Sequence, residues 1–398
     1  MIGAAISVLW VIIQVIIGFN LVFPLVLYLF YTMMKEKDLI SLTSITPEID
    51  YAIIVTAYEQ TDSLPAVVKS LQKLNYSNYV VYIVADKCDI SNLNFDDNRV
   101  ILLRPEETLA SNTRSHFYAI NRFIRPHQCL TIIDSDNLVE PDYLNRLNLW
   151  FNKGFKAVQG VREAKNLDTT FACLDAARDI YYHFYDGKVL FGAGSSATLA
   201  GSGMAFTTQL YRDCLEHLDI TGAGFDKVLQ AAILNRNERI AFTMDAIVYD
   251  EKTTKATQLV SQRSRWINTW FKYFKYGFGM MGKGITHFNR KQLLFGLILV
   301  RPPLFMFLIL SVIFAAINLL TGNILVCILW IAALLLFVFG FGLALGLSHT
   351  DKKIYRSLVN IPKFMFLQVL SLLKIFTPQS NNVATKHYVD THIDDIQK

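Results

Sequence analysis

Acidic side chains that directly follow apolar runs are the first residues of this sequence that could do chemistry. Asp134 and Asp136 come immediately after the run at 130–133. Two carboxylates that leave the edge of a sheet can bind Mg²⁺ or Mn²⁺, and phosphate oxygens of a substrate then complete the coordination shell. Such a cation stabilises negative charge on a departing diphosphate. The alternative is an acidic pair on a surface turn.

A third carboxylate, Asp86, ends another apolar run at 79–85. Its oxygens could accept a hydrogen bond from the imide group of a nucleobase. An aspartate at this kind of position can also cap a helix or a turn, because its side chain accepts hydrogen bonds from nearby backbone N–H groups. Both interpretations stay open at this point.

A basic and aromatic cluster lies far downstream, just before a long apolar region. Arg265 offers a planar fork of donors that suits a diphosphate. Trp266 offers a flat face to a sugar ring, and Gln262 can hydrogen-bond a substrate or a neighbouring loop. Taken alone, this cluster could simply begin a helix that lies in a membrane interface.

The elements around these residues predict an α/β domain from about 51 to 256. Short continuous apolar runs at 52–57, 79–85, 99–103 and 130–133 are typical of buried parallel strands. Helical spacing of apolar residues follows at 64–74 and at 113–124. Alternating strands and helices predict a mostly parallel, doubly wound sheet. Ligands bind beyond the carboxyl ends of such strands, where Asp86 and Asp134 lie.

The composition indicates a membrane protein. Hydrophobic residues make up 53% of the 398 residues. Charged residues make up only 18%, whereas about 25% is usual in soluble proteins. The apolar run at 2–34 exceeds the roughly 20 residues that cross a bilayer, and we interpret it as a retained anchor. Lys35 and Lys37 follow it and place that end in the cytosol, with the N-terminus outside. The net charge of +5 suits anionic headgroups and substrates.

The C-terminal third predicts further membrane helices. The segment 266–283 is aromatic and basic and suits an interfacial helix. Arg301-Pro302-Pro303 should break or kink the apolar run at 293–320, and the run at 324–347 is an unbroken span. The run at 359–376 is interpreted as interfacial, with a third span as the alternative. Five scattered cysteines, with no C-x-x-C pair, predict neither a zinc site nor a disulfide framework.

This ordered set of motifs resembles glycosyltransferase family 2, and particularly its membrane-embedded, polymer-forming branch: cellulose, hyaluronan, chitin and poly-N-acetylglucosamine synthases. The resemblance covers roughly 51–266 and the flanking membrane layout. It implies a GT-A domain, in which Asp86 contacts uracil and Asp134 and Asp136 hold the metal. The remaining match is the Q-x-x-R-W motif, which consists here of Gln262, Arg265 and Trp266.

The resemblance also implies roles for residues between these motifs. Asp226 would be the catalytic base that takes the proton from an acceptor hydroxyl, although it also opens a helical run and could oppose the helix dipole. Two positions depart from the family pattern: Phe225 replaces an acid before this base, and His116 stands where a phosphate-facing Lys is usual.

Two loops and the tail complete the set of implied site residues. The first loop, Ala57-Tyr58-Glu59, resembles the turn that binds the nucleotide. The second, Gly201-Ser202-Gly203, resembles a loop beside the acceptor, or is an ordinary tight turn. The tail segment Thr385-Lys386-His387 resembles a motif that some relatives fold back toward the donor.

From these residues we expect an inverting, metal-dependent glycosyltransferase in the plasma (inner) membrane, multi-pass, with a cytosolic catalytic domain. Its partners would be a nucleotide-sugar donor, a saccharide or lipid-linked acceptor, membrane lipid and a second copy of the chain, but no nucleic acid. A growing polysaccharide is the expected acceptor, a single transfer to a lipid-linked sugar is the alternative, and an inactive scaffold or transport subunit is a hypothesis of another class. The expected domains are an N-terminal transmembrane helix at 1–34, the catalytic domain at 35–256, the Q-x-x-R-W and interfacial helix at 257–290, transmembrane helices at 291–350, and an interfacial helix with a cytosolic tail at 351–398.

Overall fold

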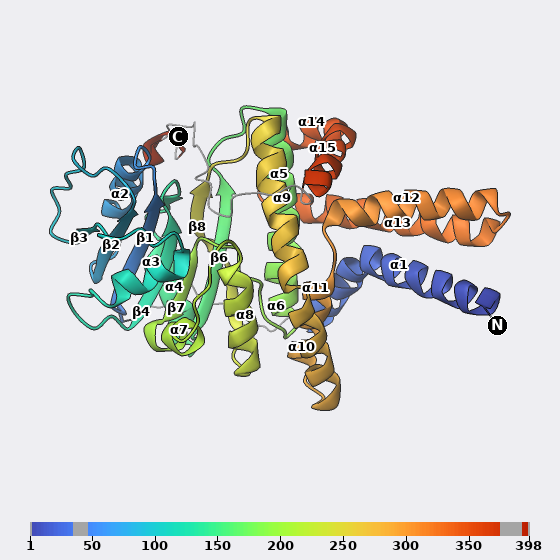
Figure 1. Ribbon diagram of the computed structural model, residues 1–398, viewed down its shortest axis with the longest axis horizontal. Helices are drawn as coiled ribbons and strands as arrows, with labels where there is room; N and C mark the ends of the chain where they lie inside the picture. Colours follow the sequence, from blue (N-terminus) through green and yellow to red (C-terminus); the bar gives the residue numbers. More distant parts are fainter. Residues whose placement is uncertain (1, 35–46, 375–391, 397–398) are drawn as a thin grey trace.

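An eight-stranded mixed sheet forms the centre of the domain (Figure 1), in the strand order β3-β2-β1-β4-β7-β6-β8-β5. The computed structural model describes residues 2–34, 47–374 and 392–396. The strands are β1 (Tyr51–Tyr58), β2 (Tyr79–Asp86), β3 (Val100–Leu103), β4 (Cys129–Asp134), β5 (Leu138–Val139), β6 (Ala157–Ala164), β7 (Met204–Thr207) and β8 (Ile240–Asp250).

The parallel half of this sheet brings the predicted acidic residues to one edge. Strands β3, β2, β1 and β4 are all parallel neighbours. The register pairs Tyr58 with Asp86 on one side of β1, and Thr56 with Asp134 on the other. Because the carboxyl ends of parallel strands meet at the same edge, these residues lie beside one another there. The α/β prediction is confirmed, although β7 is antiparallel to both of its neighbours.

Helices cover the sheet because their apolar faces need burial. Leu64, Val67 and Leu71 of the first of them are fully buried, at helical spacing. The helices of the domain are α2 (Leu64–Gln72), α3 (Asn112–Ile120), α4 (Tyr143–Asn152), α5 (Thr170–Tyr182), the π-helix η1 (His183–Val189), α6 (Leu190–Gly192), α7 (Thr208–Leu215), α8 (Phe225–Asn235) and α9 (Ala256–Tyr273).

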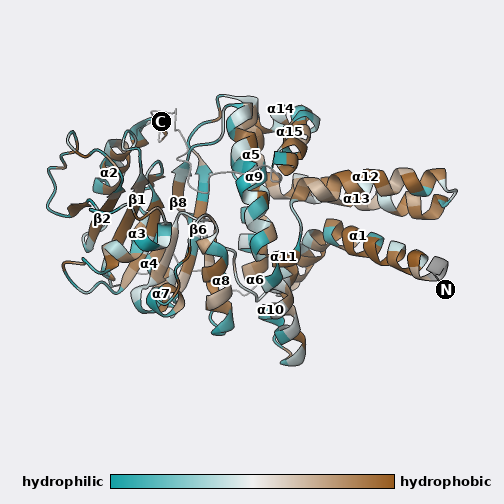
Figure 2. Cartoon of the chain, viewed as in Figure 1, coloured by the Kyte–Doolittle hydropathy of each residue, from teal (hydrophilic) through white to brown (hydrophobic). Residues whose placement is uncertain are grey.

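The long helices among the remaining elements are apolar, and Figure 2 shows them in brown beyond α9. Two helices are long and apolar enough to cross a membrane: α1 (Ile2–Met34) and α13 (Ile324–Gly346). A third span would consist of α11 (Arg290–Val300) and α12 (Leu304–Leu320), which are bent by 72° at the predicted Pro302-Pro303 break. The other elements are α10 (Lys275–Thr286), α14 (Lys352–Ser357), the 3-10 turn η2 (Leu358–Asn360), α15 (Ile361–Lys374) and α16 (Ile393–Ile396).

The helices α5 and α9 run between the sheet and the apolar helices (Figure 1). The cluster that begins at Gln262 therefore lies in the middle of α9 rather than at the start of an interfacial helix, because α9 begins at Ala256. The second half of the predicted interfacial segment is a separate helix, α10, which pairs closely with α11 through glycines such as Gly277 and Gly296. The tail motif at Thr385, Lys386 and His387 lies outside the described residues.

Candidate functional site

One cavity of about 1030 Å³ extends from the edge of the sheet to the apolar helices. Its walls come from strand ends, from α5, α8 and α9, and from α12, α13 and α15. Nine of the residues around the predicted motifs line it together: Thr56, Tyr58, Asp134, Asp136, Gly201, Asp226, Gln262, Arg265 and Trp266. The metal acids, the candidate base and the basic-aromatic cluster, which are distant in sequence, thus share one space.

The acidic end of this cavity is held by Ser202. Its hydroxyl accepts hydrogen bonds from the backbone N–H of Asp134, at 3.1 Å, and from the Asn137 amide, at 2.8 Å. Ser202 is fully buried. Ser202 therefore holds the end of β4 in place. Its neighbour Gly201 lines the cavity.

The loop around Gly201 is organised by Gln159 of β6. The Gln159 amide oxygen accepts from the N–H of Ala200, and its NH₂ group donates to the carbonyl of Ser202 at 3.0 Å. Gly201 and Gly203 have φ values of +92° and +67°, which glycine adopts without strain. This segment is therefore a turn at the cavity wall that hydrogen bonds from Gln159 hold in place.

Asp226 occupies the first turn of α8 and lines the cavity. The turn begins at Gly224, with φ of +102°. Lys227 lies 3.0 Å from the Asp226 carboxylate and also donates to the carbonyl of Leu199 at 3.1 Å. The carboxylate is thus tied to the loop that leads to Gly201, and it faces the same space as Asp134.

Helix α9 contributes the basic and aromatic wall. Arg265 is partly buried, and burial lowers its pKa. The ring of Trp266 lies under two guanidinium groups, those of Arg263 at 4.1 Å and of Arg178 at 4.3 Å from the ring centroid. The Gln262 amide oxygen lies 3.4 Å from the Thr253 hydroxyl. The two guanidinium groups hold the indole in place by cation–π attraction.

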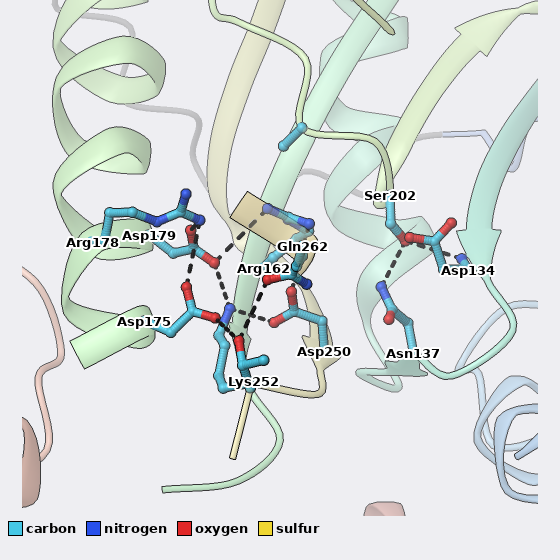
Figure 3. A network of polar contacts seen from close by, with 12 residues as sticks. Asp134, Asn137, Arg162, Asp175, Arg178, Asp179, Ser202, Asp250, Lys252 and Gln262 are labelled. Carbon is cyan, nitrogen blue, oxygen red and sulfur yellow. Dashed lines mark hydrogen bonds and ion pairs between the residues drawn. The ribbon is translucent and has the colours of Figure 1, made fainter. Parts of the chain in front are cut away.

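A buried ion network fixes α9 against the sheet (Figure 3). Lys252 contacts Asp179 at 2.6 Å and Asp250 at 2.5 Å. Arg162 reaches both carboxylates, at 3.8 Å and 3.5 Å. The network also includes Asp175, which binds Arg263, and Arg178, which binds Asp179. The network thus combines four cationic side chains with three carboxylates. Its residues come from β6, α5, α9 and the end of β8.

The ionisation of this network follows from charge pairing rather than from burial alone. Burial opposes ionisation of Asp179, but Arg178, Lys252 and Arg162 outweigh it and hold the pKa of that carboxyl well below its usual range. Burial likewise opposes the charge on Arg162, and its neighbouring carboxylates, Asp134 among them, still raise its pKa. Asp179 and Arg162 therefore stay charged at neutral pH beside the acidic end of the cavity.

Six predicted site residues lie outside the cavity lining, namely Ala57, Glu59, Asp86, His116, Ser202 and Gly203. Both carboxylate oxygens of Asp86 accept backbone N–H bonds, from Leu109 at 2.9 Å and from Ala110 at 2.8 Å. Its contact with a nucleobase stays a prediction, and the carboxylate shapes a loop at the strand end. The Ala57 side chain is buried, and Glu59 pairs with an exposed lysine, Lys87, at 2.7 Å.

The expected donor contact of His116 does not fit its placement. The imidazole is buried in the core, where Nδ1 lies 2.7 Å from the Tyr211 hydroxyl. Burial lowers the pKa of His116 to about 3, so the ring is neutral at physiological pH. A neutral ring that lies outside the cavity cannot replace a phosphate-facing lysine.

The donor atoms at the acidic end suit a divalent cation that also binds substrate. Asp134 and Asp136 supply two hard carboxylate ligands to the cavity wall. Within 2–34, 47–374 and 392–396, no group of three or more His, Cys, Asp or Glu side chains could hold a metal by itself. Mg²⁺ typically takes only one or two protein carboxylates and completes its shell with substrate phosphates and water. The residues therefore fit such an ion.

Sequence reasoning missed the network and the cationic wall. Arg162 ends the apolar stretch of β6, which is the same kind of position that singled out Asp134. Asp175, Arg178 and Asp179 share one face of α5, at helical spacing. Arg301, within the kinked apolar run, also lines the cavity. A charged residue inside an apolar segment is a signal for a functional position.

The chain is similar to known proteins in sequence and in fold. Residues 47–269 match the family model described as "Glycosyltransferase like family 2". No curated protein matches the sequence. The mannosyltransferase PcManGT from Pyrobaculum calidifontis, solved in complex with GDP-Man and Mn²⁺, is similar in structure with a TM-score of 0.57 and 13% identity. The match covers 92% of this chain and 97% of that one, and it shows a shared fold.

S. aureus TarS also matches, with a TM-score of 0.40 and 15% identity over 58% of this chain and 40% of that one. The shorter TarS 1-349 in complex with UDP matches with a TM-score of 0.36 and 15% identity, over 56% of this chain and 66% of that one.

Proposed function

The chain belongs to glycosyltransferase-like family 2, and we propose that it is an inverting, metal-dependent enzyme that transfers a sugar from a nucleotide donor to an acceptor hydroxyl. The observation that carries this proposal is the single cavity that gathers Asp134, Asp136, Asp226 and Arg265. Two acids, a separate carboxylate and a cation are the groups that departure of a diphosphate and attack by a hydroxyl require.

The donor would bind at the acidic end, with its diphosphate between Asp134 and Asp136 on one side and Arg265 on the other. A bound Mg²⁺ or Mn²⁺, held by the two aspartates, would supply positive charge for the leaving diphosphate. Arg265 would donate hydrogen bonds to the same phosphates. We expect a UDP-linked sugar, with Asp86 and the turn at Tyr58 near the base. The fold shared with a mannosyltransferase that binds GDP-Man makes GDP-sugars the second group of donors to test.

Asp226 would act as the general base. Its first-turn position and its contact with Lys227 keep a carboxylate at the cavity wall. It would accept the hydroxyl proton while the acceptor oxygen attacks the anomeric carbon, which inverts that centre in one displacement. Trp266 would hold a sugar ring against its indole face.

The acceptor would reach this site from the membrane side. A growing polysaccharide and a lipid-linked saccharide both fit that direction, with the catalytic domain in the cytosol and the helices in the plasma (inner) membrane. Two candidate spans, or three with the bent pair, leave few helices for a translocation channel unless copies of the chain associate.

A catalytically inactive scaffold is the alternative of another class. Such a protein would have no need to keep two metal-type acids, a candidate base and a cation on one cavity wall. The retention of Asp226 and Arg265 at that wall therefore favours an enzyme.

The test uses the full-length protein in detergent, with Mn²⁺ or Mg²⁺ and a panel of UDP- and GDP-sugars. Release of the nucleoside diphosphate should occur with one donor and should depend on the metal. Asp226→Asn should lower turnover at least about 10²-fold, since general-base catalysis contributes about 10²–10⁴-fold, and should leave nucleoside diphosphate binding nearly unchanged. Equal turnover by Asp226→Asn would reject the base assignment.

A further inference from the structure

The membrane end of the cavity has a different lining from the donor end. At about 1030 Å³ the cavity lies at the upper end of the usual range for ligand pockets, about 300–1,000 Å³. Val338 of α13 is 63% exposed, so this wall reaches the lipid-facing surface. Most lining side chains at this end are apolar, with Gln368 of α15 as a polar exception, and they include Leu304 and Leu308 of α12, Val338 and Phe341 of α13, and Phe364 and Met365 of α15.

This lining suits a hydrocarbon chain better than a sugar chain. Sugar hydroxyls that leave water need hydrogen-bond partners, and burial without them is unfavourable. Leucine, valine, phenylalanine and methionine side chains offer none. A hydrocarbon chain gains from burial against the same surface, and it can pass directly into the bilayer.

Some of the buried donors that line this cavity lack acceptors. Among the residues that the structure describes, Arg263 Nε and Nη1, Arg301 Nη1 and Trp270 Nε1 have no hydrogen-bond partner. All three residues line the cavity. Arg263 is only 2% exposed and Arg301 only 7%. Buried donors without partners are costly, and an anion placed in this space would satisfy them.

The position of Arg301 places this anion site next to the candidate base. Arg301 lies at the bend between α11 and α12 and pairs with Asp186 of η1. Lys227, which contacts Asp226, also acts electrostatically on Asp186. The Asp186 carbonyl also accepts the backbone N–H of Thr198 at 3.0 Å, and Lys227 donates to the carbonyl of the next residue, Leu199, at 3.1 Å. Arg301 is therefore linked through Asp186 to the loop that Lys227 holds beside Asp226.

We propose that the acceptor is a lipid, in which a saccharide is joined through a phosphate or diphosphate to a hydrocarbon chain. This inference rests on the proposed function and specifies its acceptor. The phosphate binds Arg263 and Arg301, and the chain leaves between α13 and α15. The saccharide hydroxyl oxygen forms a bond to the anomeric carbon of the donor, the bond from that carbon to the diphosphate breaks with its electron pair, and the proton passes to Asp226.

The test measures binding to the full-length protein in nanodiscs. The probes are farnesyl diphosphate, farnesol, which lacks the anion, and inorganic diphosphate, which lacks the chain. We expect farnesyl diphosphate to bind at least tenfold more tightly than either of the other two. A separate titration with UDP or GDP and Mn²⁺ reports the donor site.

Matched variants separate the two halves of the lipid. Arg301→Gln combined with Asp186→Asn, which removes the pair without leaving a charge, should weaken farnesyl diphosphate at least tenfold, and Arg301→Lys should weaken it less. Val338→Trp should weaken farnesyl diphosphate about fivefold or more without changing inorganic diphosphate. The control is Leu335→Trp, because Leu335 is equally exposed on α13, at 64%, but lies outside the cavity lining.

Two results would overturn the lipid acceptor while the proposed function stands. One is nucleoside diphosphate binding with no preference for farnesyl diphosphate over farnesol. The other is binding of a soluble hexasaccharide that Val338→Trp abolishes. If no nucleoside diphosphate binds, the proposed function fails instead, and the lipid titration shows whether the anion site exists independently.

Discussion

The two positions that depart from the family pattern contact each other. The rings of His116 and Phe225 pack edge to face, with centroids 5.1 Å apart. Phe225 directly precedes the candidate base, so the first turn of α8 rests on an aromatic core instead of a second acid. His116 in turn is held by the Tyr211 hydroxyl. The departures are therefore one packing solution that positions Asp226.

This packing predicts a pH dependence of stability. Burial lowers the pKa of His116 and of His183 to about 3, whereas an unfolded histidine titrates near about 6.5. Between these values the unfolded chain binds protons that the folded chain rejects, so stability is complete above the unfolded pKa and falls as the pH drops. At pH 5 the loss is about 2 kcal/mol for each histidine. Denaturant unfolding in detergent at pH 7.5 and 5.0 measures it.

His116→Gln keeps a polar partner for Tyr211 and removes the titration. Between the two pH values the variant should lose about 2 kcal/mol less stability than the parent, even if it is weaker at pH 7.5. His217 lies on the surface, so His217→Gln serves as the control and should follow the parent. An unchanged loss in His116→Gln would refute the assignment of this dependence to the buried ring.

At the scale of elements, the site depends on how closely α8 and α9 approach. A Cβ atom at Gly224 would lie 2.5 Å from Tyr273 Cε2 and 2.7 Å from Thr269 Cγ2, both on α9. Gly224→Ala must therefore push the start of α8, and Asp226 with it, away from the cavity wall. Misplacement of a reacting group by about 1 Å can cost about 10²-fold in rate. We expect at least a tenfold lower kcat with nearly normal donor binding, measured by steady-state kinetics.

The control for this substitution is Gly154→Ala. Gly154 also has a positive φ, of +88°, but nothing lies within 4 Å of its added Cβ. It should pay only the backbone strain, about 1–2 kcal/mol, and keep its kcat. Equal losses of kcat in both variants would show that strain, and not the contact with α9, is responsible.

Elements with a local signature could be predicted from the sequence, and contacts between elements could not. The run 130–133 predicts a strand because it is continuous and apolar, and β4 extends it by one residue at each end. Asp134 at its end follows from the same reasoning. The contact between Arg162 of β6 and Asp250 of β8 follows only from the strand order, which places β8 beside β6. The contact of Lys252 with Asp179 depends on where α5 packs. Likewise, the spacing of apolar residues around His116 fits a position on the surface as well as a position in the core.

At the scale of the whole molecule, the cavity joins a sheet edge to the candidate membrane helices, so the proposed function depends on how these helices would cross a bilayer. Inside the helical part, the Gln14 amide oxygen of α1 accepts hydrogen bonds from Asn318 of α12, at 2.6 Å, and from Trp330 of α13, at 2.9 Å. Polar contacts of this kind join helices in lipid. The three helices therefore form one unit, and both ends of the α12–α13 hairpin must lie on the same side.

The charges beside these helices predict which side that is. Lys35 and Lys37 follow α1, and Lys352, Lys353 and Arg356 follow α13, whereas the turn between α12 and α13, at 321–323, has no charge. Basic residues stay in the cytosol, so the turn should face outside and the catalytic domain inside. Thr321→Cys and Glu106→Cys, both at exposed positions, report the two sides.

A membrane-impermeant maleimide should label Thr321→Cys in intact cells and Glu106→Cys only after permeabilisation. The parent chain should stay unlabelled because all five of its cysteines are buried. Labelling of Glu106→Cys alone in intact cells would show that the orientation is the reverse of the predicted one. The donor end of the cavity would then open away from the cytosol, where nucleotide sugars are made, and the proposed reaction would lack its donor. A reversed orientation would therefore contradict the proposed function.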